Sequence, residues 1–138
     1  MAESLAHIRY VERMVSYAEV IPKTYAKSLM VADLPSYEQR TPKVINGYYP
    51  DLYYYDLKCI IIGEAKTTGD IDNDHTIGQL NSYIKEARTY NCERHIILCT
   101  SIIAFAQINN MIIRKKRKEQ IHDITFHVLD NHTRHKII

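Results

Sequence analysis

The sequence has no tryptophan, only two phenylalanines and only three cysteines, whereas it contains eleven tyrosines. The cysteines are odd in number and form no CxxC pair, and Cys59 and Cys99 fall inside apolar runs, where a thiol usually serves as a small hydrophobic side chain. This pattern argues against a disulfide framework and favours a reducing compartment.

Long apolar runs are also missing. No stretch reaches the ~18 apolar residues that a membrane-spanning helix needs, and the opening MAESLAHIRY carries an acidic residue and no apolar signal core. We therefore expect a cytoplasmic protein without a membrane partner. The chain also lacks internal repeats and the GxxxxGK(S/T) pattern of a nucleotide-driven motor.

The charge is nearly balanced, with a formal net charge of +2 and a pI near 8.4. This balance permits a nucleic-acid partner without demanding one, because strongly basic nucleic-acid-binding domains lie above pI ~9. The 138 residues, of which 46% are hydrophobic and 25% charged, predict a single globular domain over residues 1–138. A chain of this length can form a core without cross-links.

Periodicity of the apolar residues predicts alternating helices and strands. A first helix is expected from Glu3 to about Val20, with Glu12 directed into an apolar face. That face consists of Leu5, Ile8, Val11, Val15 and Ala18. The segments predicted after it are a loop or edge strand at 30–43, a strand at 44–55, a turn at 56–58, a buried strand at 59–65, a helix at 75–90, a strand at 94–100, a helix to about residue 118 and a strand at 124–129. This order predicts a mixed α/β sheet with helices on both sides, a central hairpin and later crossover units.

The most apolar of these strands ends in charged residues. Asp51 lies near the start of one strand of the expected hairpin, and Glu64 and Lys66 lie at the end of the other. Glu64 and Lys66 share a face because they are two residues apart, and pairing through the turn near Asp56 would bring Asp51 beside Glu64. Two adjacent carboxylates repel unless a cation neutralises them, and Mg²⁺, with Mn²⁺ as a substitute, prefers such oxygen ligands. Alternatively, Glu64 and Lys66 form an ordinary strand-end pair that faces water.

The pair Pro50-Asp51 followed by Glu64-Ala65-Lys66 resembles the motif of the PD-(D/E)xK nuclease superfamily. The following helix contains GQLNSYI, in which Gln79 and Tyr83 resemble the QxxxY pattern of the RecB-type branch. The resemblance implies a restriction-endonuclease-like αβββαβ core, a mixed central sheet flanked by helices, here followed by a C-terminal helix and strand.

The resemblance also implies roles for individual residues. Asp51 and Glu64 would ligate the metal together with the Ala65 carbonyl, and Lys66 would position the attacking water. Gln79 and Tyr83 would sit beside the site, where they contact the DNA backbone or orient Lys66.

A glutamate of the first helix joins the metal in some members of the superfamily, and Glu12 is the matching residue here. Glu12 could equally lie at the edge of the apolar stripe with its carboxylate in solvent. The basic run at 114–118 is either a solvated helix end or a phosphate-contacting patch. Tyrosines around the motif could stack on bases, or fill a sheet face and a subunit contact.

These expectations define a Mg²⁺-dependent deoxyribonuclease that hydrolyses DNA phosphodiester bonds, in an endo or exo mode, in repair, recombination, phage or restriction. The alternatives are a non-catalytic nucleic-acid-binding or assembly subunit on the same fold, and a structural α/β domain with no nucleic-acid role. Because the chain has no separate recognition domain, we expect a homodimer or a protein partner that supplies specificity.

Overall fold

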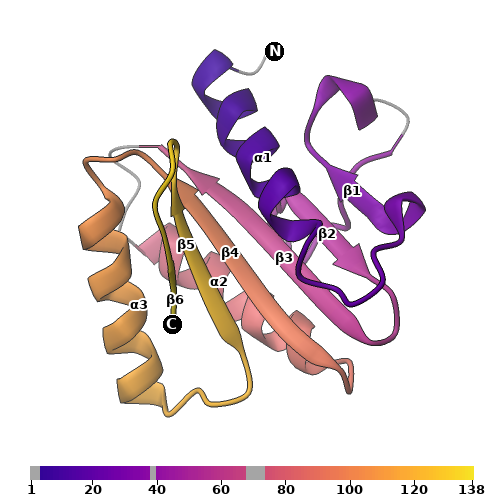
Figure 1. The fold of residues 1–138 in the computed structure, drawn as a ribbon. Helices are drawn as coiled ribbons and strands as arrows, with labels where there is room; N and C mark the ends of the chain where they lie inside the picture. Colours follow the sequence, from indigo (N-terminus) through magenta and orange to yellow (C-terminus); the bar gives the residue numbers. More distant parts are fainter. Residues whose placement is uncertain (1–3, 38–39, 68–73) are drawn as a thin grey trace.

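The computed structural model describes residues 4–37, 40–67 and 74–138, which form one six-stranded sheet with helices on both faces (Figure 1). In sheet order, which is also chain order, the strands are β1 (Met30–Ala32), β2 (Leu52–Tyr55), β3 (Cys59–Lys66), β4 (Glu93–Thr100), β5 (Thr125–Asp130) and β6 (His135–Ile137). The helices are α1 (Leu5–Ala18), α2 (Asp74–Arg88) and α3 (Phe105–Glu119), with short 3₁₀ turns at Lys27–Leu29 and Pro35–Tyr37. Strands β1 to β3 pair antiparallel, β3 to β5 pair in parallel, and β6 is antiparallel to β5. The predicted mixed α/β sheet flanked by helices is confirmed.

The central hairpin joins β2 to β3 through the predicted turn at 56–58. Asp56 Oδ1 accepts hydrogen bonds from the backbone N–H groups of Lys58 and Cys59, each at 2.9 Å, while Leu57 adopts a φ of 76°. The strand expected at 44–55 is shorter than predicted and begins only at Leu52. A proline has no N–H for a strand ladder, and Pro50 therefore separates β2 from a small preceding turn.

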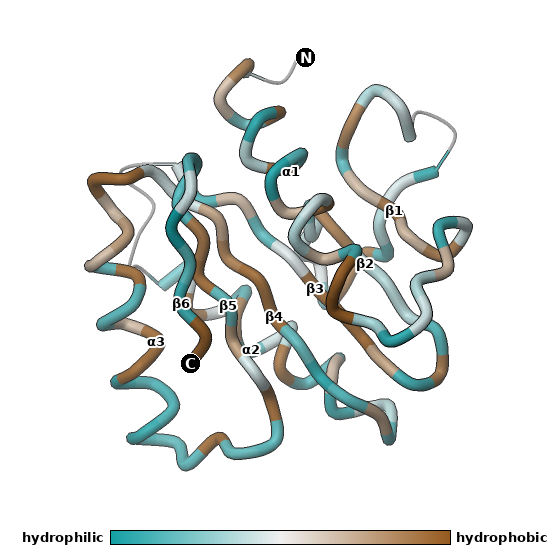
Figure 2. Tube along the Cα trace, in the orientation of Figure 1, coloured by the Kyte–Doolittle hydropathy of each residue, from teal (hydrophilic) through white to brown (hydrophobic). Residues whose placement is uncertain are grey.

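Strand β3 lies at the centre of the molecule, and all eight of its residues are buried. Ile60 and Ile62 belong to the core beneath α2 and α3, while Cys59 and Ile61 belong to the core beneath α1. The hydropathy colouring in Figure 2 shows this apolar character along the middle of the sheet. A strand covered on both faces has little freedom to move, so the side chains at its two ends are held in fixed positions.

Helix α1 buries only part of the predicted apolar face: Val11 and Ala18 are buried, and Ile8 and Val15 are partly buried. It begins after Ser4, whose hydroxyl oxygen accepts from the His7 N–H at 3.1 Å. Its buried residues are Tyr10, Val11, Met14 and Ala18. Leu5 is 63% exposed and Glu12 is exposed, so the expectation that Glu12 points into the apolar face is wrong. The reason lies in β3, where a Cβ on Gly63 would stand 3.2 Å from Met14 Sδ: the missing side chain makes room for Met14.

Helices α2 and α3 cover the opposite face. Leu80, Ile84 and Ala87 of α2 are buried as predicted, whereas Ile77 is partly exposed. The basic run at 114–118 forms the end of α3, where the helix dipole favours positive charge, and these turns are hydrophilic in Figure 2. None of the helices in the described ranges is both long enough and apolar enough to cross a membrane.

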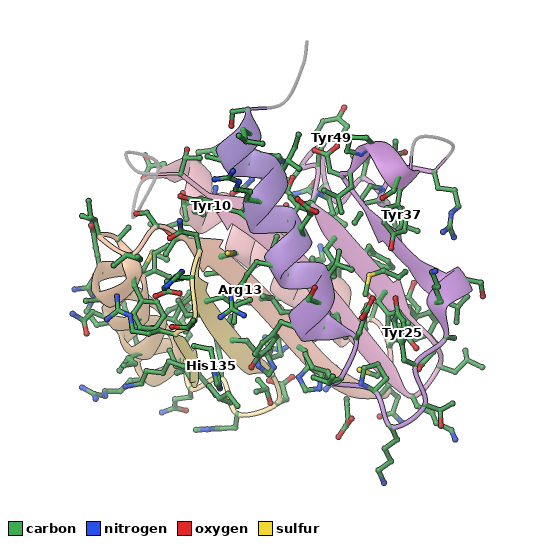
Figure 3. All side chains as sticks on the ribbon, turned by 45° about the horizontal axis from the view of Figure 1, so that its top comes forward. Tyr10, Arg13, Tyr25, Tyr37, Tyr49 and His135 are labelled. Carbon is green, nitrogen blue, oxygen red and sulfur yellow. The ribbon has the colours of Figure 1, made fainter. Side chains whose placement is uncertain are left out.

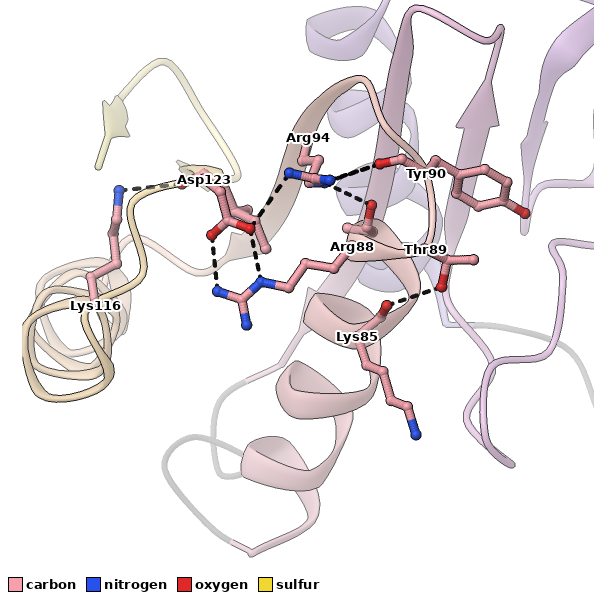
Figure 4. A network of polar contacts seen from close by, with 9 residues as sticks. Lys85, Arg88, Thr89, Tyr90, Arg94, Lys116 and Asp123 are labelled. Carbon is pink, nitrogen blue, oxygen red and sulfur yellow. Dashed lines mark hydrogen bonds and ion pairs between the residues drawn. The ribbon is translucent and has the colours of Figure 1, made fainter.

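A polar network lies beside the start of β4 (Figure 4). Asp123 accepts two hydrogen bonds from Arg88, at 2.8 and 2.9 Å, and a longer one from Arg94. Arg94 also donates to the carbonyl oxygens of Ala87 and Tyr90. These contacts join the end of α2 to the start of β4 and to the segment before β5.

Candidate functional site

The charged residues predicted from the motif meet at the C-terminal end of β3. Leu52 pairs with Gly63, and the Asp51 N–H donates to the Gly63 carbonyl at 2.9 Å, which places Asp51 beside Glu64. Lys66 ends the strand, and its carbonyl accepts from Thr100 Oγ1 at 2.9 Å. The antiparallel hairpin thus brings together residues from two strands, as the sequence predicted.

The Asp51 side chain is fixed by contacts on both of its oxygens. Oδ2 accepts from the backbone N–H of Ala65 at 2.8 Å. Oδ1 lies 3.3 Å from Nε2 of His7, which comes from the first turns of α1. The carboxylate is therefore anchored between β3 and α1, with little freedom to rotate.

Among the acidic residues of this region, Glu64 has the most strongly shifted pKa. The Tyr83 hydroxyl donates to Glu64 Oε1 at 2.5 Å. Burial raises the pKa of the Glu64 carboxyl well above 4.5, and the charge of Asp51 and a hydrogen bond to it raise this pKa further. The Tyr83 hydrogen bond and the Lys66 charge act in the opposite direction. The combined effect favours the neutral form of Glu64 beside Asp51, and the two carboxyl groups share this buried space.

Lys66 and Gln79 form the second contact between β3 and α2. The Lys66 ammonium donates to the Gln79 side-chain carbonyl. Gln79 and Tyr83 are four residues apart on α2 and lie on the same side of the helix. The four residues Asp51, Glu64, Lys66 and Gln79 are each no more than 7% exposed, and Tyr83 is fully buried. One side of α2 therefore supplies a partner to both functional groups at the end of β3.

The close approach of α2 depends on a glycine. The Tyr48 hydroxyl sits against Gly78 so closely that a Cβ at position 78 would overlap with it. Burial and the charge of Glu64 raise the pKa of Tyr83 above 10, and the nearby Tyr48 hydroxyl contributes to this shift. Gly78 thus makes the space that Tyr48 occupies against α2.

The other tyrosines near the motif mostly belong to the fold. The Tyr53 hydroxyl donates to Glu86 at 2.7 Å, and the Tyr54 hydroxyl donates to Asp56 at 2.6 Å. Tyr55 packs on the ring of Tyr90 with centroids 4.2 Å apart. Tyr49, by contrast, is 73% exposed and stands at the top of the molecule (Figure 3). Tyr53, Tyr54 and Tyr55 therefore pack within the fold, while Tyr49 remains available to a partner.

The α1 residue that lies beside Asp51 is His7 and not Glu12. They are five positions apart, so Glu12 is rotated by about 140° around the helix from His7. His7 lies four residues before Val11 and seven before Met14, so it belongs to the stripe that α1 buries in the structure. Residues at that spacing share one helix face.

Asp33 is the second residue of this region that the sequence did not suggest. It directly follows β1, and its N–H donates to the Asp51 carbonyl at 2.8 Å. His7 Nε2 lies 3.3 Å from Asp33 Oδ2, and the ligand atoms of His7, Asp33 and Asp51 all lie within 4.8 Å of one another. These three side chains together could hold a metal ion next to Glu64.

Comparison with known proteins adds nothing to this geometry. No family model, no curated protein and no solved structure matches the chain.

Proposed function

We propose that this chain is a Mg²⁺-dependent deoxyribonuclease of the PD-(D/E)xK type, with a restriction-endonuclease-like core. The observation that supports the proposal most is the convergence of Asp51, Glu64 and Lys66 at one buried point, with Gln79 and Tyr83 bonded to two of them. The order of elements, a helix, three strands, a helix and a strand, agrees with the αβββαβ core of that fold.

The residues present suit a hard divalent cation. Ala65 donates to one oxygen of Asp51, and Tyr83 donates to one oxygen of Glu64. The other Asp51 oxygen faces His7 Nε2 at 3.3 Å. Asp51, Glu64 and the Ala65 carbonyl would hold Mg²⁺ or Mn²⁺, with His7 and Asp33 beside them. When bound, the metal supplies positive charge that offsets the two carboxylates and activates water for attack on phosphorus.

The protein side chains contribute position and charge. Gln79 holds the Lys66 ammonium in one place, where it can orient a water molecule or stabilise the charge that develops on a phosphate oxygen. Tyr83 holds Glu64 in one rotamer. These hydrogen bonds hold both groups in place before the phosphodiester bond breaks, which limits their reorganisation in the chemical step.

DNA is the substrate that we propose, and a second copy of the chain or another protein would supply specificity. Arg114, Arg117 and Lys118 line a groove of about 550 Å³ between α2 and α3. Such a cluster is suited to contact phosphates outside the cleavage site.

The test is cleavage of supercoiled plasmid, linear duplex, single-stranded and branched DNA with Mg²⁺ or Mn²⁺. Asp51→Asn and Lys66→Met are expected to abolish cleavage. Glu12→Gln and Lys58→Met make matched changes at exposed positions and are expected to retain it. Absence of cleavage on every substrate, or cleavage that persists in both site variants, would refute the proposal.

One observation favours the alternative of a non-catalytic nucleic-acid-binding subunit. Asp51, Glu64 and Lys66 are nearly inaccessible in the described part of the chain, so a duplex could not reach them without some opening. DNA binding in a gel-shift assay, unaffected by Mg²⁺ and by Asp51→Asn, together with no cleavage, would support that alternative.

A further inference from the structure

A second cluster of ligand-type side chains lies at the opposite end of β3. Cys59, Glu93 and His95 each place one ligand atom within 4.8 Å of the other two. Cys59 begins β3 and Glu93 begins β4, and the two residues are partners in the parallel register. The Glu93 N–H donates to the Lys58 carbonyl at 3.1 Å, which fixes the two strand starts side by side. His95 follows two residues after Glu93 and therefore shares its face of the sheet.

His95 has one ring nitrogen bonded and one without a partner. Its Nδ1 lies 2.9 Å from Nε2 of His127, and the other nitrogen of His127 lies 2.8 Å from the Tyr17 hydroxyl. His95 Nε2 is buried and has no hydrogen-bonding partner within the described ranges, and the nearest Glu93 oxygen is 4.0 Å away. A buried polar atom without a partner is costly, so this nitrogen requires an explanation.

The hydrogen-bond chain offers two proton arrangements. If His127 donates to Tyr17, then His127 accepts from His95 Nδ1–H, and His95 Nε2 carries a free lone pair directed toward Cys59 and Glu93. If the chain runs the other way, His95 Nε2 carries a buried N–H with no acceptor. In the first arrangement, a bound cation gives the lone pair of His95 Nε2 a partner, whereas in the second arrangement it does not. The first arrangement also matches the usual pattern of metal-ligating histidines, whose second ring nitrogen is held by a hydrogen bond.

We propose that Cys59 Sγ, His95 Nε2 and the Glu93 carboxylate bind one Zn²⁺ ion or a similar transition metal. A thiolate with an imidazole selects soft or borderline metals over Mg²⁺. Glu93 has a side chain that is 67% exposed, so it can turn toward the other two ligands without disturbing the core.

The site would keep one coordination position open. Zn²⁺ is usually four-coordinate, and three protein ligands leave room for a water molecule or an anion. A cavity of about 320 Å³ adjoins Cys59 and Glu93, and Lys23 and Lys58 also line it. Asp56 lines the same cavity, so its charged walls combine two lysines with the carboxylates of Asp56 and Glu93.

Metal titration of the purified protein, stripped of metal with a chelator, tests the proposal. We expect one Zn²⁺ per chain at this site by calorimetry, and with Co²⁺ we expect the absorption band of thiolate-to-cobalt charge transfer. Cys59→Ser should remove the band, and His95→Gln should weaken binding by at least about 100-fold, since loss even of an outer partner of a ligand costs about 10–100-fold. Tyr17→Phe, which changes only the end of the hydrogen-bond chain, should weaken binding by about tenfold.

Two variants serve as controls. Cys92→Ser removes a partly exposed thiol outside the cluster and should keep both the band and the affinity. Asp51→Asn should also keep them, which separates this site from the proposed nuclease site at the other end of β3. No Zn²⁺ binding, a cobalt band that persists in Cys59→Ser, or a band lost in Cys92→Ser would overturn the proposal. If Cys59→Ser unfolds, Glu93→Gln replaces it as the test, because an exposed side chain can change without loss of the fold. Unchanged Zn²⁺ affinity in both Glu93→Gln and His95→Gln would also overturn the proposal.

Discussion

The two ends of β3 differ in chemistry although one buried strand supports both. At the C-terminal end, carboxylates and an ammonium are enclosed together, with Glu64 bonded to Tyr83 and Lys66 bonded to Gln79. At the N-terminal end, a thiol and an imidazole adjoin an exposed carboxylate. The first set is suited to a hard cation and the second to a softer one. The comparison teaches that the strand supplies part of each set, Glu64 and Lys66 at one end and Cys59 at the other, while the neighbouring elements supply the partners of these side chains.

The stability contributed by the two ends also depends on pH with opposite sign. Burial raises the pKa of Glu64, so the folded protein holds a proton there more tightly than the unfolded chain does. Burial, followed by the charges of His95 and His135, lowers the pKa of His127 from 6.5 to about 4, so the folded protein holds a proton there less tightly. Stability from the first group is lost as the pH rises, and stability from the second is lost as the pH falls.

The largest expected effect is that single substitutions abolish one activity, DNA cleavage or Zn²⁺ binding, and leave the other unchanged. Lys66→Met should lower the rate of DNA cleavage by about 1,000-fold or more, because a fixed charge at the transition state is worth several kcal/mol, and it should leave Zn²⁺ affinity unchanged. His95→Gln should lower Zn²⁺ affinity and leave the cleavage rate within about twofold, since distant sites act nearly independently. Cleavage assays and zinc titrations on both proteins measure this. A variant that changes both properties would show that the ends are coupled.

The second effect concerns acid stability at the His127 end. The folded pKa is about 4 against 6.5 for the free side chain, and each unit is worth about 1.4 kcal/mol. The metal-free protein should therefore lose about 3 kcal/mol through this group as the pH falls from 7 to below 4.

His127→Phe, which cannot take up a proton, should show a smaller loss than the wild type over the same pH range. Urea unfolding at pH 7 and pH 4.5 measures the difference. His122→Gln, at an exposed histidine, is the matched control and should behave as the wild type. Equal losses in the wild type and His127→Phe would contradict the expected sign.

The third effect is the opposite pH dependence at the Glu64 end. The contribution of Glu64 is fully present below pH 4.5 and is lost as the pH rises toward its raised folded pKa. Glu64→Gln should thus raise the melting temperature of the metal-free protein at pH 7 by roughly a few degrees, since 1 kcal/mol corresponds to about 4 °C at this chain length. Thermal unfolding in EDTA at pH 5 and pH 7 checks this. The gain should shrink when Mg²⁺ is added, and a gain that is independent of pH would rule out the assigned cause.

The smallest effect is expected at the surface network that lies near the start of β4. The side chains of Arg88 and Asp123 are 45% and 38% exposed, and surface ion pairs contribute about 0–1 kcal/mol. Arg88→Ala should therefore lower the free energy of unfolding by less than about 1 kcal/mol, and the loss should shrink in ~1 M salt. Urea unfolding at low and high salt gives both values. A larger loss that persists in high salt would show that this network, and not the buried strand, anchors the N-terminal end.

The sequence predicted the features that depend on local patterns. The apolar run at 59–65, the turn at Asp56 and the amphipathic helix around Leu80 were enough to place the sheet and its hairpin. The same patterns brought Asp51, Glu64 and Lys66 together, because strand pairing converts a spacing along the chain into proximity.

Other features could not be predicted, because they depend on contacts between distant segments. The rotation of α1 that buries Met14 and leaves Leu5 exposed depends on the fit of Met14 over Gly63. His7 reaches Asp51 only when that rotation is known. Strand β6 has three exposed residues and therefore no apolar pattern to reveal it. The Cys59, Glu93 and His95 cluster requires the register between two parallel strands, which no single segment encodes.

The space left by two glycines has a consequence for how this sequence can diverge. Gly63 directly precedes Glu64 and faces Met14 and Leu52, and Gly78 directly precedes Gln79 and faces Tyr48. A side chain at either position requires a smaller residue opposite it, so Gly63 should covary with Met14 and Leu52, and Gly78 with Tyr48. In diverged homologues, these paired exchanges would trace common descent through positions that take no part in chemistry, even where the charged residues themselves have been replaced.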